Sequence, residues 1–171
     1  PGIRVLAFFV CMAAVIVLGF SACSTVKDDE QFLKNLQTGL EKRWDKSDGN
    51  VTAQAALKEL VQLEVSAIGE YEEYTFENQG LADLAKQYCD ALQNQLEGLQ
   101  YLESDEQKYH DVFTVKGYHE RAKVLFSLSN DFDFKVSDKH ASTYQEMVQL
   151  GEKAYRLTDV METLSSDVLS G

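Results

Sequence analysis

The sequence predicts an all-α fold, an antiparallel bundle of four or five helices that follows an apolar N-terminal segment. Three observations support this prediction. Pro1 is the single proline, and the rest of the chain is rich in the helix formers Leu, Gln, Glu, Lys and Ala. Apolar residues recur at intervals of three and four positions, as they do along one face of a helix. Short stretches rich in Gly, Asn, Asp and Ser separate these periodic segments.

The first helix is predicted over residues 30–44. Its apolar face is spaced by three, four and four positions: Leu33, Leu36, Leu40 and Trp44. Asp28 or Asp29 is the expected N-cap, because an acidic side chain stabilises the positive end of a helix. Gly39 lowers helix propensity by about 1 kcal/mol relative to Ala, and we expect it to permit a close crossing with a second helix. The turn-forming stretch DKSDGN, residues 45–50, ends this element.

Two further helices are predicted over 52–68 and 81–102. The first of them has a broad apolar stripe, which suits a helix packed on two neighbours: Ala56, Leu57, Leu60, Val61, Leu63, Val65 and Ile68. The second keeps helical spacing over six turns: Leu81, Leu84, Ala85, Tyr88, Leu92, Leu96 and Leu99. The acidic connector between them, which Gly69 and Gly80 bracket, is expected to direct Tyr71, Tyr74 and Phe76 inward.

A fourth helix is predicted from Ser104 to about Leu128. Residues 104–107 match a capping box, in which Ser104 and Gln107 exchange hydrogen bonds with exposed backbone amides. This cap favours a tight hairpin at residue 104 over a kinked continuous helix. The segment NDFDFKV, residues 130–136, alternates apolar and charged residues. We interpret it as an extended linker whose aromatic side chains seal one end of the bundle.

The last helix is predicted to begin at Ser137 or Asp138. Its apolar residues step by three and four in a heptad pattern: Met147, Leu150, Ala154, Leu157, Met161 and Leu164. Two interpretations fit this pattern. The seam packs inside an antiparallel bundle, which we favour, or it forms a coiled coil with a second copy of the chain. The second interpretation predicts self-association through the 147–164 helix.

The N-terminal segment has the features of a secretory signal. Arg4 precedes 16 residues, Val5–Phe20, that carry no charge. As a helix they would span about 24 Å, less than the roughly 30 Å core of a bilayer. The run ends in Phe20-Ser21-Ala22-Cys23, which resembles the lipobox of bacterial lipoproteins, with Phe20 in place of the usual Leu. The resemblance implies cleavage before Cys23 and acylation, for example with palmitate, of that residue.

This resemblance implies a protein anchored by lipid on the extracytoplasmic face of the cell membrane. Residues 1–22 would be the signal peptide, 23–30 the acylated Cys23 with a polar tether, and 31–171 the helical domain. Two alternatives remain open: a retained transmembrane anchor, or an ordinary signal that is cut before Cys23. Basic Arg4 before the apolar run and the acidic residues 28–30 after it place the bulk of the chain outside in any membrane topology.

The charge of the chain disfavours nucleic acid as a partner. The formal charge is −12, and it becomes −13 once Arg4 leaves with residues 1–22. Phosphate backbones bind favourably to Lys and Arg, so a surface this acidic binds nucleic acid poorly. Anionic headgroups would repel it as well. The expected partners are the membrane, through the anchor, and a protein at the cell surface.

The chain lacks the usual signatures of catalysis and of cofactor binding. It contains no zinc-ligand spacing, no Gly-rich phosphate loop and no nucleophile elbow. His110 and His119 are nine residues apart and would point to opposite sides of one helix, and His140 is expected to be exposed at a helix start. Cys89 is expected to act as a small apolar residue in the core. We therefore predict no cofactor, no metal and no catalytic residue.

Arg43, Trp44 and Arg121 are the candidate binding residues, although each is equally suited to bridge helices. The helical part is also similar to uncharacterised lipoproteins and secreted helical domains of Gram-positive bacteria, in residues 32–45, 81–95 and 117–121. The expected function is that of a non-enzymatic binding or envelope adaptor module. A structural or oligomerising membrane-anchored module is the main alternative, followed by a metal-dependent enzyme that uses acidic residues.

Overall fold

A computed structural model describes residues 27–47 and 54–170. Its helices are α2 (Asp29–Lys46), α3 (Gln54–Ile68), α4 (Gln79–Gly98), α5 (Glu106–Tyr109), α6 (Glu120–Asp131) and α7 (Ala141–Ser170). A π-helical stretch, η3 (His110–His119), joins α5 to α6, so that residues 106–131 form one continuous rod. Three short 3-10 turns complete the described part: η1 (Tyr71–Glu73), η2 (Leu99–Tyr101) and η4 (Asp138–His140). The predicted all-α fold is confirmed.

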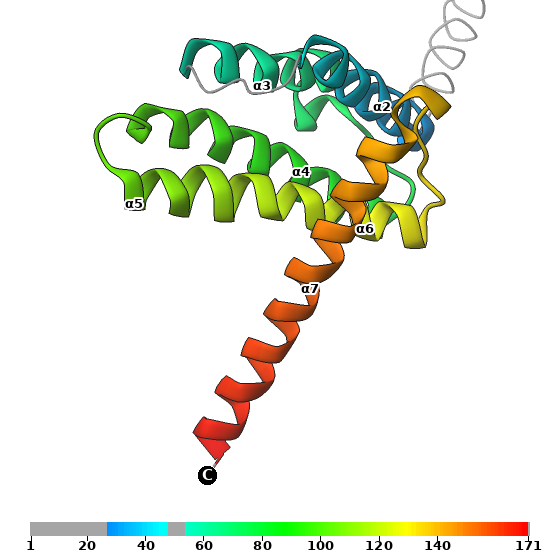
Figure 1. Cartoon of the computed structure of the whole chain (residues 1–171). Coiled ribbons are helices and arrows are strands. Elements are labelled where there is room, and N and C mark those ends of the chain that lie inside the picture. Colours follow the sequence, from blue (N-terminus) through cyan, green and yellow to red (C-terminus); the bar gives the residue numbers. More distant parts are fainter. Residues whose placement is uncertain (1–26, 48–53, 171) are drawn as a thin grey trace, which may run out of the picture.

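Two helical hairpins face each other (Figure 1). In one, α2 and α3 lie side by side; in the other, α4 is paired with the rod α5–η3–α6 after the tight turn at residues 102–105. The hairpin predicted at residue 104 is therefore confirmed. Helix α7 crosses α6 at a steep angle, and its C-terminal half projects away from the bundle. None of the described helices is long and apolar enough to cross a membrane.

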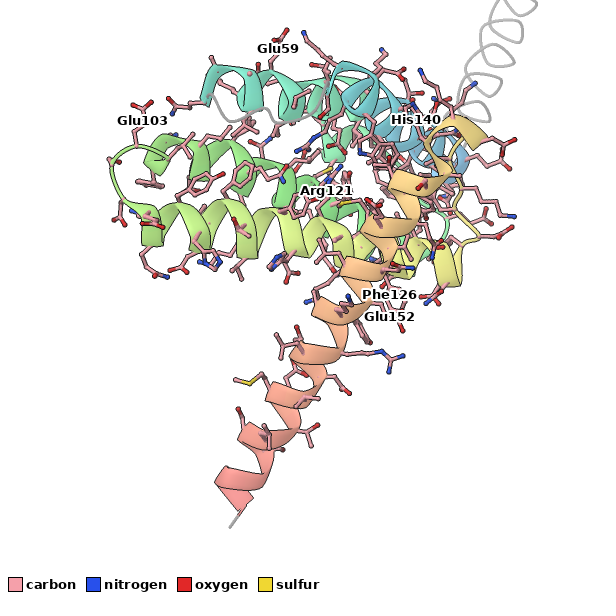
Figure 2. The ribbon with its side chains drawn as sticks, viewed as in Figure 1. Glu59, Glu103, Arg121, Phe126, His140 and Glu152 are labelled. Atoms are coloured by element: carbon pink, nitrogen blue, oxygen red, sulfur yellow. The ribbon has the colours of Figure 1, made fainter. Side chains whose placement is uncertain are left out.

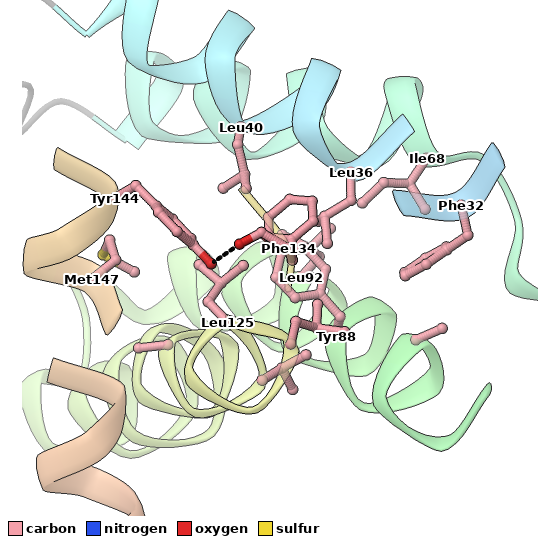
Figure 3. Close-up of a cluster of buried hydrophobic side chains, with 14 of the residues drawn as sticks. Phe32, Leu36, Leu40, Ile68, Tyr88, Leu92, Leu125, Phe134, Tyr144 and Met147 are labelled. Carbon is pink, nitrogen blue, oxygen red and sulfur yellow. Dashed lines mark hydrogen bonds between the residues drawn. The ribbon is translucent and has the colours of Figure 1, made fainter. Parts of the chain in front are cut away.

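The core lies between the two hairpins and is closed by the first turns of α7 (Figure 3). Each of the long helices contributes side chains to it. Among them are Phe32, Leu36, Leu40, Val61, Tyr88, Leu92, Leu125, Leu128 and Met147. The segment 132–137 has no regular structure and buries Phe134, whose carbonyl oxygen accepts a hydrogen bond from the hydroxyl of Tyr144 at 3.1 Å. Tyr71, Tyr74 and Phe76 of the connector pack on the same core. Both predictions about these connecting segments are thus confirmed.

Gly39 lets α2 and α3 approach closely, as its position in the sequence suggested. A Cβ atom at residue 39 would lie 3.0 Å from the Cα of Glu64 and 3.3 Å from the Cβ of Ala67. Real Cβ atoms rarely meet backbone carbon at so short a distance. The crossing at Gly39 places Glu64 beneath α2, at the level of the buried charges described below.

The N-terminal caps differ in part from those predicted. Asp105, not Ser104, is the N-cap of α5: its backbone is extended, and its carboxylate accepts a hydrogen bond from the amide of Lys108 at 3.0 Å. Ser104 belongs to the preceding turn, where its own amide donates to the carbonyl of Tyr101. The capping-box prediction is therefore wrong, because the turn out of α4 uses one residue more.

Asp28 occupies the N-cap position of α2, but its side chain does not cap the helix. Its carboxylate accepts from the amide of Thr75 at 2.8 Å, and that of Asp29 accepts from the amide of Glu77 at 2.7 Å. Both carboxylates therefore tie the start of α2 to the connector between α3 and α4. Helix α2 begins at Asp29, two residues before the predicted start of the helical domain.

The favoured interpretation of the 147–164 seam is right for its first half and wrong for its second. Met147 is buried, and Leu150 and Ala154 are half-buried against α6 and η3. Leu157, Met161 and Leu164 are 55–64% exposed, because α7 has by then left the bundle. No other described element covers this part of the stripe.

Candidate functional site

A cluster of charged and polar side chains lies buried where α2, α3, α4 and α6 meet. At its centre is the carboxylate of Glu64, which is fully buried. Nη1 of Arg43 forms an ion pair with Oε2 of Glu64, and Nη2 of Arg121 lies 3.1 Å from the same oxygen. Nε of Arg121 donates to Oε1 of Glu64 at 3.2 Å. One carboxylate therefore serves two guanidinium groups, and Figure 2 places Arg121 in the interior, between the two hairpins.

Two residues of α4 complete the cluster. The hydroxyl of Tyr88 donates to Oε1 of Glu64 and accepts from Nε of Arg121 at 2.9 Å. Oε1 of Gln95 accepts from Nη1 of Arg43 at 3.1 Å. Because four helices each supply a member, the cluster fixes their relative rotation as well as their separation.

The cluster carries one more positive charge than negative charge. Burial and repulsion from Arg121 lower the pKa of Arg43, against the attraction of Glu64. Burial also opposes the charge of Arg121, yet Glu64 and Tyr88 hold its pKa above the usual value. Guanidinium groups stay protonated in proteins, so both residues are cations. Arg43 is the less compensated of the two, and its side chain is 10% exposed, against 2% for Arg121.

The two cations hold the single carboxylate in its ionised form. Burial by itself raises the pKa of Glu64, but the charges of Arg121 and Arg43 and the hydrogen bonds from Tyr88 and Arg43 outweigh it, and the net pKa is lowered. A low dielectric strengthens both the penalty for burial and the attraction between the partners. At this position the attraction of the ion pairs exceeds the penalty for burial, and Glu64 is ionised.

A cavity of about 460 Å³ lies beside the cluster, among α2, α3, η3, α6 and α7. Both arginines line it, whereas Glu64, Tyr88 and Gln95 are not among its lining residues. The rest of the lining is mainly apolar or aromatic, with a few polar groups: Trp44, Ser47, Leu57, Leu60, Tyr118, Thr143, Glu146, Met147 and Leu150. Glu146, the one carboxylate of this lining, belongs to an exposed residue. The cavity therefore has cationic groups on one side and apolar groups around them.

Two buried donors of the cluster have no hydrogen-bond partner among the described residues. They are Nε2 of Gln95 and Nη2 of Arg121. Nη2 of Arg121 is within ion-pair distance of Glu64 but does not form a hydrogen bond with it. An unmet donor on a buried charged group is costly. Both atoms are buried, so their missing hydrogen bonds add to the cost of burying the cluster.

Each member of the cluster occupies a core position of its own helix. Arg43 follows Leu36 and Leu40 at helical spacing, and Arg121 stands between Tyr118 and Leu125. Glu64 lies in the stripe that contains Leu60, Val61 and Ile68. Burial of a charge at such a position requires a partner. Local helix formation thus brings the charged groups inward, and tertiary packing pairs them.

Trp44 lies at the edge of the cavity, beside a second ion pair. Its ring centroid is 5.5 Å from that of His140. Nε2 of His140 lies 2.9 Å from Oδ1 of Asp45, which also binds Lys139 at 2.6 Å. His140 is 6% exposed, so the expectation that it is solvent-exposed is wrong. The 3-10 turn η4, which contains His140, bends the chain back over the end of α2 and buries the His140 ring.

The structure brings all three candidate binding residues, Arg43, Trp44 and Arg121, to this one cavity. Sequence reasoning missed Glu64 and Gln95. Each is a polar residue within an apolar stripe, and that is the signal by which they were recognisable. The predicted cleavage and lipidation residues, Phe20, Ser21, Ala22 and Cys23, lie outside the described residues.

Cys89 is half-buried against the core, as predicted, and burial raises the pKa of its thiol to about 11. The thiol is therefore protonated at neutral pH, the form that reacts poorly. In residues 27–47 and 54–170, no three His, Cys, Asp or Glu side chains gather in a group that would hold a metal ion.

The fold and the site together define a class: an all-α bundle with a buried arginine–glutamate–arginine cluster that opens on a cavity. No protein-family model, curated protein or solved structure matches the chain.

Proposed function

We propose that the chain is a lipid-anchored, extracytoplasmic helical module that binds a small organic anion without transforming it. The observation that carries the proposal is the cavity beside Arg43 and Arg121, where two guanidinium groups share one carboxylate. An uncompensated buried charge is unfavourable, and an anion in the cavity would neutralise it. A carboxylate matches the forked donors of arginine well.

The rest of the cavity suggests an anion with an apolar part. Trp44, Leu57 and Met147 offer aromatic and aliphatic surface, and about 460 Å³ lies in the usual range of small-molecule sites. The Glu146 carboxylate would disfavour anions with charge at both ends. We therefore expect monocarboxylates with a short aliphatic or aromatic tail to bind best.

Trp44 provides a direct test, because it is the single tryptophan of the chain and lines the cavity. Hexanoate and phenylacetate should change its fluorescence, with Kd values at least about tenfold below those of hexanamide and phenylacetamide, a difference of ~1.4 kcal/mol. Arg43→Gln should remove this preference while it leaves Glu64 and Arg121 as a neutral pair. Lys42→Gln, which removes an equal charge from the neighbouring exposed residue, is the matched control.

Equal affinity for acids and amides would contradict the proposal, as would an equal loss in Arg43→Gln and Lys42→Gln. The absence of any fluorescence change up to about 10 mM would exclude even weak binding, with Kd values near 1 mM.

The anchor is tested separately, through the mass of the mature chain. We expect the full chain, expressed in a Gram-positive host and extracted with detergent, to have the mass of residues 23–171 plus a diacylglyceryl group. Cys23→Ala should abolish this product. A mass that still includes residues 1–22 in both proteins would instead indicate a retained membrane helix.

A further inference from the structure

The C-terminal half of α7 carries an apolar stripe that no described element covers. Leu157, Val160, Met161 and Leu164 lie at positions i, i+3, i+4 and i+7, and each is 52–64% exposed. Every residue from 155 to 166 is exposed, and the contacts of this half with the bundle lie at its start, where the Tyr155 ring is 5.8 Å from that of Phe126 and the Thr158 hydroxyl accepts from Nζ of Lys123 at 3.3 Å. Isolated helices of this length are marginal in water. Asp159 and Glu162 lie on the far side of the helix from the stripe, whereas Arg156 borders it next to Val160.

The stripe continues a packing face that the bundle already uses. Leu150 and Ala154 belong to the same side of α7, and they line a groove of about 290 Å³ together with Val115 of η3. Val115 is itself 40% exposed. The groove thus joins the exposed stripe to the body of the bundle, and a helix laid along the stripe would end in it.

Charge distinguishes the two ends of this surface. Lys123 and Lys153 line the groove, along with His119 and a single carboxylate, that of Glu120, which is paired with Lys123 at 3.0 Å. Residues 157–170, by contrast, contain three acidic residues and no Lys or Arg. On a chain with a formal charge of −12, the groove is locally basic, whereas the end of α7 is acidic.

We propose that the stripe binds a second copy of this chain, with the two α7 helices antiparallel and the acidic end of each in the groove of the other. This arrangement has the two-fold symmetry of most homodimers, in which the same patch serves both subunits. A parallel pair would bring the two acidic ends together and leave both basic grooves empty. The antiparallel pair buries the stripe of both copies and places opposite charges next to each other. It is independent of the proposed anion site.

The full chain in a nonionic detergent provides the test, with micelles in excess so that the N-terminal segment does not force chains together. Sedimentation equilibrium from low micromolar to submillimolar protein should give the mass of two chains. Leu164→Asp should give single chains over the whole range. Ser166→Asp, which adds the same charge at an exposed position on the opposite side of α7, should leave the dimer intact.

The arrangement of the pair has its own test. Lys153→Glu should weaken the dimer at least about tenfold, or ~1.4 kcal/mol. Lys58→Glu, the same change at an exposed residue of α3, should not weaken it. A single-chain mass for the parent at every concentration would overturn the proposal, since the stripe would then serve a different partner. Equal masses for the parent and Leu164→Asp would overturn it too, and an insensitive Lys153→Glu would exclude the antiparallel pairing.

Discussion

Replacement of Glu64 by glutamine is expected to lower the free energy of unfolding by about 3–5 kcal/mol, the range for an ion cluster that loses one partner. The amide keeps the shape of the side chain but removes the only charge that balances Arg43 and Arg121 in the cluster. Two buried guanidinium groups would then face each other without compensation. Urea unfolding of the detergent-solubilised chain, followed by far-UV circular dichroism, would measure the loss.

Two variants show whether the charge balance causes this loss. Glu59→Gln removes an exposed carboxylate from the same helix, where it pairs with Lys46, and should cost less than about 1 kcal/mol. Arg43→Gln should cost only about 1–2 kcal/mol, the value of its hydrogen bonds, because Glu64 and Arg121 remain as a neutral pair. If Arg43→Gln proves as damaging as Glu64→Gln, the cluster does not carry the excess positive charge that we infer.

The same carboxylate predicts a dependence on pH. The folded-state pKa of Glu64 lies below the usual value of 4.5 for a glutamate. Its ionised form therefore stabilises the fold fully above that value, and the contribution disappears as the pH falls through the lower folded-state pKa. We expect the difference in stability between the parent and Glu64→Gln to shrink as the pH falls below about 4.5, and to stay constant above about 6.

Gly151→Ala is expected to destabilise the protein by about 3 kcal/mol or more, the upper end for overpacking. Gly151 lies where α7 crosses α6, and a Cβ atom there would come within 2.5 Å of the carbonyl carbon of Ala122. Backbone cannot yield as a flexible side chain does, so α7 would have to shift away. The same unfolding measurement would quantify the effect, which is opposite in sign to helix propensity, since Ala exceeds Gly by about 1 kcal/mol.

Gly80→Ala is the matched control, the same change at an exposed helical glycine. There the nearest atom to a new Cβ is the side-chain oxygen of Asn78 at 3.1 Å, and the next is Cζ of Phe132 at 3.9 Å. A small shift of the Asn78 side chain relieves this contact, so the stability should change by less than about 1 kcal/mol. Similar losses in both variants would mean that the close crossing at Gly151 does not limit packing.

The crossing at Gly151 also bears on the cavity. Met147 and Leu150, which precede Gly151 on α7, line it. A shift of α7 would therefore open the cavity as well as weaken the core. Gly151→Ala should for this reason reduce the fluorescence response of Trp44 to hexanoate, provided that the variant remains folded.

The sequence by itself determined the helices and their order. Spacings of three and four place apolar residues on one face of each segment, and this pattern depends only on local geometry. Gly39 was recognisable as a point of close crossing, because a glycine inside a helix lowers helix propensity and local structure gives no reason for its presence. Arg43 and Arg121 were recognisable as members of the charge clusters 41–43 and 120–121, suited either to bind or to bridge helices.

Tertiary structure decided what those charges meet and where the packing face of α7 ends. Glu64 is 21 residues from Arg43 and 57 from Arg121, and no local rule pairs side chains across such separations. His140 was expected in solvent, but the turn η4 folds it onto Trp44 and Asp45. The heptad pattern of α7 is uniform along the sequence, yet half of it packs and half projects. Burial depends on which elements lie opposite, and a helical period specifies a face without specifying its neighbour.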